Sequence, residues 1–441
     1  MAMPEILHIA SHMGGGVGKV LANATVHANS TSDAYVHKII CLEEPEQRQF
    51  IDYAQNNGVS VKIKPPLREI CEDMSVADIV QVEWWHHPVM AEFMVRHLTQ
   101  KMRLVIWSHN SGHFPPVIEP AFIKEPHCFI FSTPYSYESP YLRKMSEEEL
   151  KKQTEVVFSS GGFKGLSGII PHRTRGFRIG YVGTLNPCKL HPKFVEYIKT
   201  VNIGEATFVM VGDSTDKRWI EELAQEHGVT EQLEFKGYIQ GISQELRQMD
   251  VFSYILNPKH YGTTENALLE AMAVGIPPVV LNQAAEKFLV RHMDTGIVVE
   301  DVKSYGQAIR FLYQNPEERK RLGDNASKWV KRELSIEKTV AKLHDIYDSL
   351  LNKEKRDFDF CTVFGKNPAD WFLSCLGDER SFFYWLENIN EATEKNEVQR
   401  RWLLTSDILK EKNKSSLFHF YRYYPKDSRL SKWVQLLQGH C

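Results

Sequence analysis

Hydrophobic residues in the first ~170 positions form short runs, and amphipathic stretches separate these runs. The predicted strands are 6–10, 35–42, 79–83, 103–108, 128–132 and 156–159. After a polar break at 171–176, a second series is predicted at 177–182, 207–211, 233–235, 251–255 and 278–281. Strands that alternate with helical segments are typical of parallel sheets built from βαβ units. We therefore predict two Rossmann-like, doubly wound α/β domains, 1–172 and 173–350, which face a cleft at the carboxyl ends of their strands.

The last part of the chain, residues 351–441, differs in composition from the two predicted domains. Charged amphipathic helices are predicted at 316–331 and 336–351, and a mainly helical, aromatic and basic extension follows them. The simplest interpretation is that its aromatic side chains pack on the two domains. The alternative is a platform for a membrane surface or an acceptor, because aromatic and basic side chains suit that interface.

The segment 257–281, NPKHYGTTENALLEAMAVGIPPVVL, combines a loop, a helix and a buried strand. We expect Gly262, Thr263 and Thr264 to end the preceding strand and open the helix. Gly275 can terminate the helix, and Pro277 prevents its continuation. Glu270 lies among apolar neighbours in this helix, where a carboxylate is costly unless a donor satisfies it.

Two glycine-containing loops follow predicted strands. Gly15 and Gly16, in the run GGGVGK, would let backbone amides approach an anion at a helix N-terminus, although a plain tight turn explains them as well. The run is no P-loop, because Met13 and Val20 stand where glycine and a hydroxyl residue are needed. The second loop, GYVGTLNPCK, contains Gly183, Thr184 and Lys189.

Composition excludes several classes of protein. A net charge of −3 argues against a general nucleic-acid binder. No apolar run approaches the ~20 residues that span a bilayer, and the N-terminus lacks the pattern of a secretory signal peptide. Seven scattered cysteines favour a reduced, cytoplasmic protein. Histidines and acids show no zinc-ligand spacing, and Asp357-Phe358-Asp359 falls in a linker, so we expect no bound metal.

The segment 257–281 resembles the donor-nucleotide motif of retaining GT-B glycosyltransferases of family four, the glycosyl transferases group 1. The family pattern is a Glu, seven residues, a second Glu, Ala-Met-Ala, Gly and Pro. Glu270 begins the matching second half, but Gly262 stands at the position of the first Glu. Glu265 comes three residues later, and we expect it to contact the donor sugar in place of the missing acid.

The resemblance continues from 177 to 300 and implies further site residues. In the family, an Arg and a Lys after the first strand contact the donor diphosphate; here Lys189 matches and Thr184 replaces the Arg. Glu270 would hold the ribose hydroxyls. The other implied donor-binding residues are Gly15, Gly16, Gly183, Gly237, Tyr238, Gly262, Thr263 and Thr264. His109, with His86 and His87 as rivals, would lie near the donor sugar or acceptor.

The resemblance therefore implies a retaining, metal-independent hexosyltransferase with His109, Glu265 and Lys189 as catalytic candidates. It would move a sugar from a UDP- or GDP-linked donor to a saccharide or lipid-linked saccharide in the synthesis of surface polysaccharides or glycoconjugates. We expect no other cofactor, and a cytoplasmic location that includes contact with the inner face of the membrane through 351–441. Alternatives are a nucleotide-sugar epimerase, a non-catalytic subunit that binds nucleotide sugars and, from the glycine loop with Glu43, a nicotinamide dehydrogenase.

Overall fold

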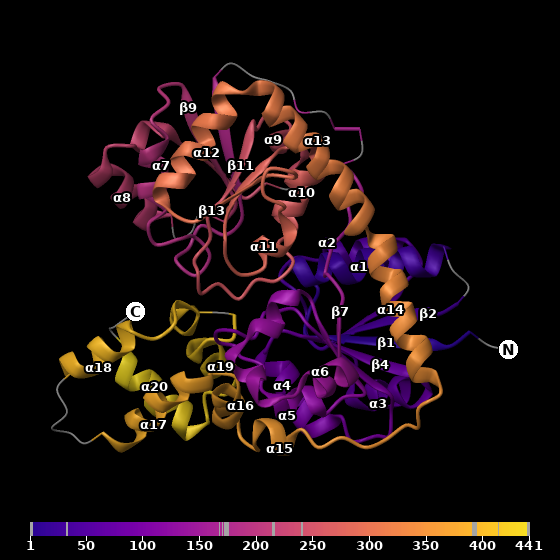
Figure 1. Cartoon of the computed structure of the whole chain (residues 1–441). Helices are drawn as coiled ribbons and strands as arrows, with labels where there is room; N and C mark the ends of the chain where they lie inside the picture. Colours follow the sequence, from indigo (N-terminus) through magenta and orange to yellow (C-terminus); the bar gives the residue numbers. More distant parts are fainter. Residues whose placement is uncertain are drawn as a thin grey trace. The chain divides into compact units, whose positions relative to one another are not determined.

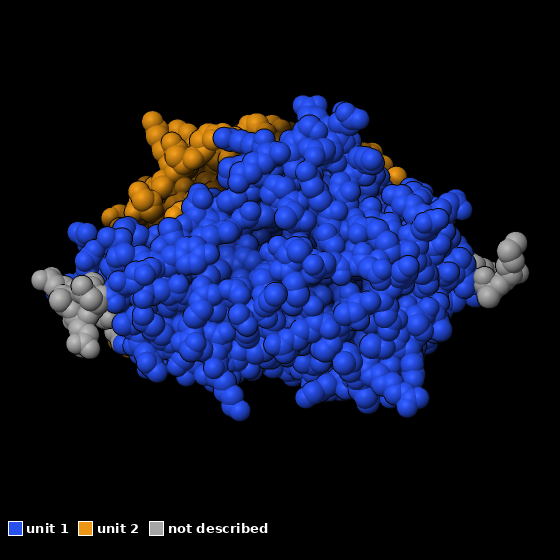
Figure 2. Space-filling model, turned by 90° about the horizontal axis from the view of Figure 1, so that it is seen from below, with its two compact units in different colours: residues 1–159, 261–263, 339–441 blue, residues 160–260, 264–338 orange. Residues whose placement is uncertain are grey.

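The chain forms two compact units, coloured separately in Figure 2: residues 1–159, 261–263 and 339–441, and residues 160–260 and 264–338. The computed structural model describes residues 3–31, 34–166, 168–169, 171, 176–213, 217–239, 241–389, 395–412 and 414–438. Each unit contains one parallel sheet with helices packed against it (Figure 1).

The sheet of the first unit has seven strands in the order β3-β2-β1-β4-β5-β6-β7, and neighbouring strands are parallel. The chain starts in the middle of the sheet, builds outward to β3 and then returns to β4, so its direction of winding reverses between β1 and β4. Ligands bind at such a reversal point in open α/β sheets. The strands are β1 Glu5–Ala10, β2 Val36–Cys41, β3 Ser60–Ile63, β4 Ile79–Trp84, β5 Leu104–Ser108, β6 Cys128–Phe131 and β7 Thr154–Val156.

Helices cover this sheet because its strands carry buried side chains on both faces. The helix α14 (Ile336–Leu351) enters the first unit at Thr339, where Leu343, Ile346 and Tyr347 join a core cluster with β1, β4 and β5. The other helices before the C-terminal segment are α1 Gly16–Thr31, α2 Gln49–Asn56, α3 Leu67–Val76, α4 Pro88–His97, α5 Pro120–Lys124 and α6 Glu147–Gln153.

The C-terminal segment belongs to the first unit and has an aromatic core. Trp371, Trp402 and Trp433 are fully buried. The segment also bonds to the sheet-bearing part of the unit, since the backbone N–H of Val117 donates to the carbonyl of Cys375 at 2.7 Å. Its helices are α15 Cys361–Phe364, α16 Pro368–Ser374, α17 Arg380–Asn388, α18 Lys395–Leu403, α19 Leu417–Tyr423 and α20 Ser428–Leu437. Packing therefore accounts for most of its aromatic side chains.

The second unit repeats the doubly wound plan with six parallel strands in the order β10-β9-β8-β11-β12-β13. Winding reverses between β8 and β11. The strands are β8 Phe177–Val182, β9 Ala206–Val211, β10 Leu233–Gly237, β11 Val251–Tyr254, β12 Pro278–Leu281 and β13 Ile297–Val299. The helices are α7 Phe194–Val201, α8 Arg218–His227, α9 Ser243–Leu246, α10 Asn266–Val274, α11 Glu286–Leu289, α12 Val302–Gln314 and α13 Pro316–Glu333.

The fold confirms two doubly wound domains and a helical C-terminal part, and it shows two strands that the pattern missed, β3 and β13. Both are short, with four and three residues, and give little periodic signal. The compact units divide the chain near 159 and 338 rather than at 172 and 350; α14 from Thr339 onward and the segment that follows it belong to the first unit. Most of the predicted linker, 172–175, lies outside the described residues.

Within the described ranges, every helix is either too short or too polar to cross a bilayer.

Because α10 packs closely against α13, we expect one added methyl group at Gly323 to lower the stability of the protein. A Cβ added to Gly323 in α13 would lie 1.9 Å from the carbonyl oxygen of Gly275, the residue that ends α10. Alanine normally stabilises a helix interior by about 1 kcal/mol relative to glycine, but here the methyl group meets backbone that cannot rotate away. We expect Gly323→Ala to destabilise the protein by about 1–3 kcal/mol in urea unfolding.

The matched control is Gly204→Ala, because a Cβ at Gly204 meets nothing within 4 Å. Equal stability of the two alanine variants would contradict the close backbone contact.

Candidate active site

The loops that follow β8 and β11 meet at the reversal point of the second sheet and fix Lys189. The backbone N–H of Lys189 donates to Oδ1 of Asn186 at 3.1 Å, and the N–H of Asn257 donates to the carbonyl of Lys189 at 2.9 Å. Leu190 and Leu256 form an antiparallel bridge between the same loops. The lysine predicted from sequence is therefore held in place by backbone contacts, although its side chain keeps a 20% exposed fraction.

Lys189 forms an ion pair with Glu265. Its Nζ lies 2.5 Å from Oε2 of Glu265, and the Tyr254 hydroxyl donates to the same oxygen at 2.6 Å. Nδ1 of His260 is 3.6 Å from the other carboxylate oxygen, and Nε2 of His260 lies 3.2 Å from Glu286. Two of the three predicted catalytic residues are thus in direct contact.

The partners of Glu265 decide its charge. Its side chain is 5% exposed. Burial alone would raise the pKa of Glu265, but the charges of Lys189 and His260, with hydrogen bonds from Lys189 and Tyr254, lower it to about 2. Burial and the nearby carboxylate raise the pKa of Tyr254 well above its usual value, so this hydroxyl stays a donor. Glu265 is therefore ionised at neutral pH although it is buried.

The start of α10 differs from the expectation. Sequence reasoning placed the opening at Gly262 to Thr264 and put Glu265 in the first turn. The helix begins at Asn266, and Glu265 is the residue before it. Its side chain makes no capping bond because Lys189 and Tyr254 take the carboxylate instead. Within the same helix, Glu270 is partly exposed.

The remaining predicted residues of the second unit line the carboxyl edge of its sheet. The backbone N–H of Gly183 bonds to Val211 at 2.9 Å, and that of Gly212 bonds to Gly237 at 2.9 Å. A Cβ on Gly212, whose φ is +149°, would lie 1.9 Å from the carbonyl oxygen of Gly183. Thr184 and Tyr238 follow two of these glycines, and Tyr238 is 60% exposed. Thr264 is buried in this unit, whereas Gly262 and Thr263 belong to the first.

His109 lies at the carboxyl end of β5 in the first unit, as predicted. Its Nε2 is 2.8 Å from Oε2 of Glu83, a fully buried residue of β4. No signal in the sequence pointed to this carboxylate, which is the last residue of the predicted strand 79–83. Burial opposes ionisation of Glu83, but hydrogen bonds from His109 and His8 lower its pKa to about 2. The rival His86 donates Nε2–H to the carbonyl of Trp371 at 2.9 Å and so connects two parts of the unit.

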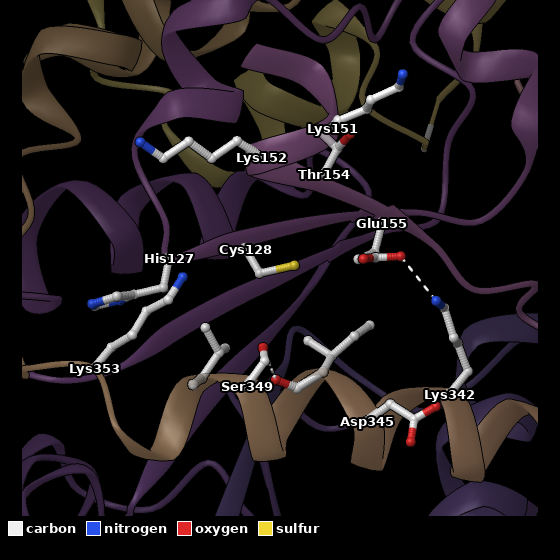
Figure 3. A pocket seen from close by; sticks show the side chains of 12 residues that line it. His127, Cys128, Lys151, Lys152, Thr154, Glu155, Lys342, Asp345, Ser349 and Lys353 are labelled. Carbon is white, nitrogen blue, oxygen red and sulfur yellow. Dashed lines mark hydrogen bonds and ion pairs between the residues drawn. The ribbon is translucent and has the colours of Figure 1, made fainter. Parts of the chain in front are cut away.

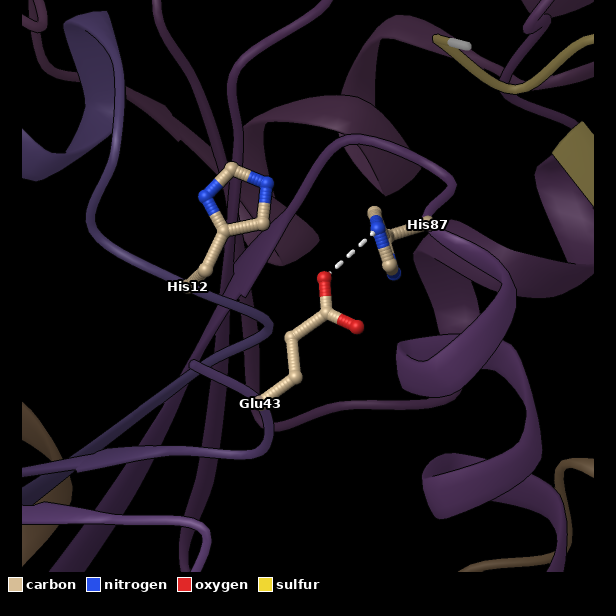
Figure 4. Close-up of side chains that lie close together, drawn as sticks. All are labelled: His12, Glu43 and His87. Carbon is tan, nitrogen blue, oxygen red and sulfur yellow. Dashed lines mark ion pairs between the residues drawn. The ribbon is translucent and has the colours of Figure 1, made fainter. Parts of the chain in front are cut away.

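A second cluster in the first unit joins His12, Glu43 and His87 from loops after β1, β2 and β4 (Figure 4). Nε2 of His87 is 3.1 Å from Glu43, and the Tyr423 hydroxyl donates to the other oxygen of Glu43 at 2.6 Å. Ligand atoms of the three residues lie within 4.8 Å of one another, which is close enough to test for a metal site.

The hydrogen bonds of these histidines do not suit a metal. Nδ1 of His12 accepts the N–H of Gly14 at 3.1 Å, and Nδ1 of His87 accepts that of Val89 at 3.3 Å. A neutral ring that accepts at Nδ1 carries its proton on Nε2. A metal-binding histidine has the reverse arrangement, in which the second nitrogen donates to an acceptor. The cluster therefore consists of N–H donors beside a carboxylate.

Comparison with known proteins identifies the second unit. Residues 167–329 match the model of the family described as glycosyl transferases group 1. N-acetyl-alpha-D-glucosaminyl L-malate synthase of Bacillus anthracis is 26% identical over 162 residues, which are 36% of this chain and 42% of that protein. Residues 167–329 form a group 1 glycosyltransferase domain.

Solved structures extend the likeness in fold to most of the chain. Anabaena HepE in complex with UDP has a TM-score of 0.62 and 14% identity, covering 79% of this chain and all of HepE. A glycosyltransferase from Rickettsia africae has a TM-score of 0.64 and 14% identity, covering 80% of this chain and all of that one. The two parallel sheets are those of the GT-B fold.

The glycine run at the start of α1 has open space beside two of its residues. Cβ atoms added to Gly15 or Gly16 would meet nothing within 4 Å, and both residues are exposed. Gly18 is the residue that the turn requires, because its Cβ would lie 2.1 Å from the carbonyl oxygen of Met13. A tight turn thus explains Gly18 but not Gly15 and Gly16.

A pocket of about 140 Å³ at the other edge of the first sheet is not part of the candidate site (Figure 3). It lies beside His127 and Thr154, at the amino ends of β6 and β7, whereas ligand sites of parallel sheets lie at the carboxyl ends. Its Lys342 is paired with Glu155 at 3.0 Å, and the other lysines that line it are Lys151, Lys152 and Lys353.

The Lys189–Glu265 ion pair predicts that substitutions at these two residues have non-additive effects on the unfolding free energy. Lys189→Met removes the cation and leaves the buried carboxylate of Glu265 without its main partner. We expect this variant to lose about 3–5 kcal/mol of unfolding free energy. Adding Glu265→Gln should recover most of that loss, because the double variant lacks both charges of the pair. Urea unfolding of both single variants and the double variant measures the coupling; additive effects would contradict a buried ion pair.

Buried histidines of the first unit predict acid sensitivity. Burial lowers the pKa of His86 to about 4 and that of His419 to about 3, against 6.5 in an unfolded chain. Both are neutral when folded, so the unfolded state binds more protons below pH 6.5 and stability falls as the pH drops. His419→Phe keeps an aromatic ring and should reduce this dependence by about 1.4 kcal/mol per pH unit between pH 6 and 4. Unfolding measured across that range with an unchanged slope would contradict the assignment.

Proposed function

We propose that this protein is a retaining, metal-independent hexosyltransferase that moves a sugar from a UDP- or GDP-linked donor to a saccharide or lipid-linked saccharide acceptor. The observation that carries the proposal is the Lys189–Glu265 pair at the reversal point of the group 1 glycosyltransferase domain. The structures of Anabaena HepE with UDP and with UDP-glucose support a nucleotide-sugar donor.

Lys189 would neutralise the donor diphosphate. When the bond between sugar and phosphate breaks, the leaving diphosphate gains negative charge, and a preorganised cation stabilises that charge. Lys189 is partly exposed and already held by its backbone, so its Nζ has only to turn from Glu265 toward the phosphate. A diphosphate would then replace the carboxylate as its partner.

Glu265 would hold the donor sugar once Lys189 turns. Its carboxylate keeps the hydrogen bond from Tyr254 and gains room to accept one from a sugar hydroxyl. This gives it the role of the acid that the family carries at the position of Gly262. Glu270 would bind the ribose hydroxyls, and the backbone after β8 and β10, at Gly183, Thr184, Gly237 and Tyr238, would contact the nucleotide.

The first unit would bind the acceptor. Its cluster of His12, Glu43 and His87 lies at the reversal point of the first sheet and combines N–H donors with a carboxylate, a set that suits sugar hydroxyls. Trp85 lies edge-on to His12 with ring centroids 5.4 Å apart and adds an apolar surface for a sugar ring. Gly15 and Gly16 would offer backbone N–H groups to the donor phosphates, the role that the resemblance implies.

The reaction would retain configuration at the anomeric carbon. The bond from that carbon to the diphosphate oxygen breaks and leaves an oxocarbenium-like centre. The acceptor oxygen then bonds to the same face, and its proton passes to the leaving phosphate oxygen. No redox change and no metal enter this balance.

A non-catalytic subunit that binds nucleotide sugars is the second candidate. Thr184 in place of the family's Arg and Gly262 in place of its first Glu favour it, since both changes remove a charged contact with the donor. An epimerase would differ from both candidates because it would convert the donor sugar without transfer.

The function is tested by mass spectrometry of products from a panel of UDP- and GDP-sugars with oligosaccharide acceptors, in buffer that contains a chelator. The proposal expects a product one hexose larger, with the donor's anomeric configuration. Glu265→Gln should lower the transfer rate at least about tenfold, because the sugar contact acts on kcat, while free nucleotide diphosphate binds within about twofold of wild type.

Asp250→Asn is the matched control, because Asp250 is another carboxylate of this unit with a side chain only 8% exposed, and it is paired with Arg319 at 3.3 Å. Its transfer rate should stay close to that of the wild type. Binding of nucleotide sugar without turnover would favour the non-catalytic subunit, and strict dependence on Mg²⁺ or Mn²⁺ would reject metal independence.

A further inference from the structure

A chain of hydrogen bonds inside the first unit begins at His109. Nε2 of His109 is 2.8 Å from Glu83, and the other oxygen of Glu83 is 3.0 Å from Nδ1 of His8. Nε2 of His8 is 2.9 Å from Nδ1 of His37, whose Nε2 lies 3.2 Å from Nε2 of His344. His109 follows β5, and Glu83 lies in β4. His8, His37 and His344 lie in β1, β2 and α14, respectively.

When the rings of His8, His37 and His344 are neutral, the donor and the acceptor of each of these hydrogen bonds are fixed. An ionised carboxylate only accepts, so His8 donates from Nδ1 and its Nε2 must accept. His37 then donates from Nδ1 and accepts at Nε2, and His344 donates from Nε2. Burial lowers the pKa of His37 well below its usual value and also lowers that of His344, which keeps both rings neutral. Every proton therefore points toward Glu83.

Further bonds stop the carboxylate of Glu83 from rotating. Gln81 donates Nε2–H to the oxygen that also faces His8, at 2.8 Å, and its own Oε1 accepts from the Tyr347 hydroxyl at 2.7 Å. The other oxygen faces His109. Gln81 and Glu83 alternate along β4 with the apolar Val80, Val82 and Trp84, so they lie on one face of the strand.

Stability alone does not require this arrangement. A buried charge and its partners are often no more stabilising than apolar side chains of similar volume. The charge of Glu83 does, however, fix the imidazole of His109 in two ways. It sets the orientation of the ring, and it holds the proton on Nε2, which leaves the lone pair on Nδ1.

We propose that Glu83 is a positioning residue for His109, and that His8, His37 and His344 hold the carboxylate of Glu83 in the orientation that this role requires. His109 would then accept a hydrogen bond from a substrate hydroxyl at Nδ1 without first reorienting or changing tautomer. This inference rests on the proposed function, because it places His109, the first residue of this series of hydrogen bonds, next to the substrate.

The first test uses the wild-type protein. Ring-nitrogen NMR of the ¹⁵N-labelled protein distinguishes the two neutral tautomers, and the His109→Gln spectrum identifies the His109 signals among the 18 histidines. The proposal expects His109 to carry its proton on Nε2. A proton fixed on Nδ1 would overturn it, and this result does not depend on any activity.

The second test uses Glu83→Gln, which keeps the shape of the side chain and removes the charge. We expect His109 to lose its fixed tautomer, and kcat for transfer to fall at least about tenfold with the donor KM changed by less than about twofold. If Glu83→Gln does not fold, Glu83→Asp takes its place in this test. Asp keeps the charge but has a shorter side chain, and we expect it to lower kcat as well. Unchanged kcat and tautomer in either variant would overturn the proposal.

Tyr35→Phe is the matched control. Tyr35 packs beside His37 and His344 and bonds to Asp348, but it makes no bond to Glu83. This variant should retain both kcat and the His109 tautomer, and a loss equal to that of Glu83→Gln would show a merely structural effect and overturn the positioning role. If wild type transfers no sugar from any donor, the proposed function fails, while the ring-nitrogen spectra still decide whether Glu83 fixes His109.

Discussion

The buried carboxylate of Glu265 is the point on which the glycosyltransferase domain is organised. A carboxylate that loses its hydration needs strong donors, and Lys189 and Tyr254 supply them. These donors come from the loop after β8 and from β11, so satisfying one charge brings together the strands on both sides of the reversal point and the start of α10. The Lys189 cation is therefore held at the reversal point of this sheet by contacts within the protein.

The first unit solves a similar problem in a different way. Glu83 is also buried and ionised, but its partners are histidines and an amide rather than a lysine. These partners carry no permanent positive charge, so the charge of Glu83 is stabilised by the hydrogen bonds that they donate. A lysine pair suits the neutralisation of a phosphate, whereas a carboxylate–histidine pair suits control of a proton position.

The C-terminal segment contributes side chains and backbone groups that contact polar residues of the first unit. Tyr423 bonds to Glu43, and the carbonyl of Trp371 accepts from His86. His419 packs edge-on to His87 with ring centroids 4.8 Å apart. Side chains more than 330 positions away thus complete the surroundings of the His12–Glu43–His87 cluster. Aromatic residues that looked like a separate appendage are part of the packing of the first unit.

The sequence by itself determined the local elements and supplied candidates for the chemistry. The bounds of β8 and β12 and the existence of α14 follow from runs of apolar residues interrupted by glycine and proline, which act within a few positions. The resemblance to the group 1 glycosyltransferases singled out Lys189, Glu265 and His109 as candidates, each at the end or start of such an element. Only the tertiary structure decided their partners. Parallel strands that are neighbours in a sheet are far apart in the chain, so no local pattern reveals that Glu83 meets His109 and His8, that Lys189 meets Glu265, or that residues 351–441 pack on the first sheet.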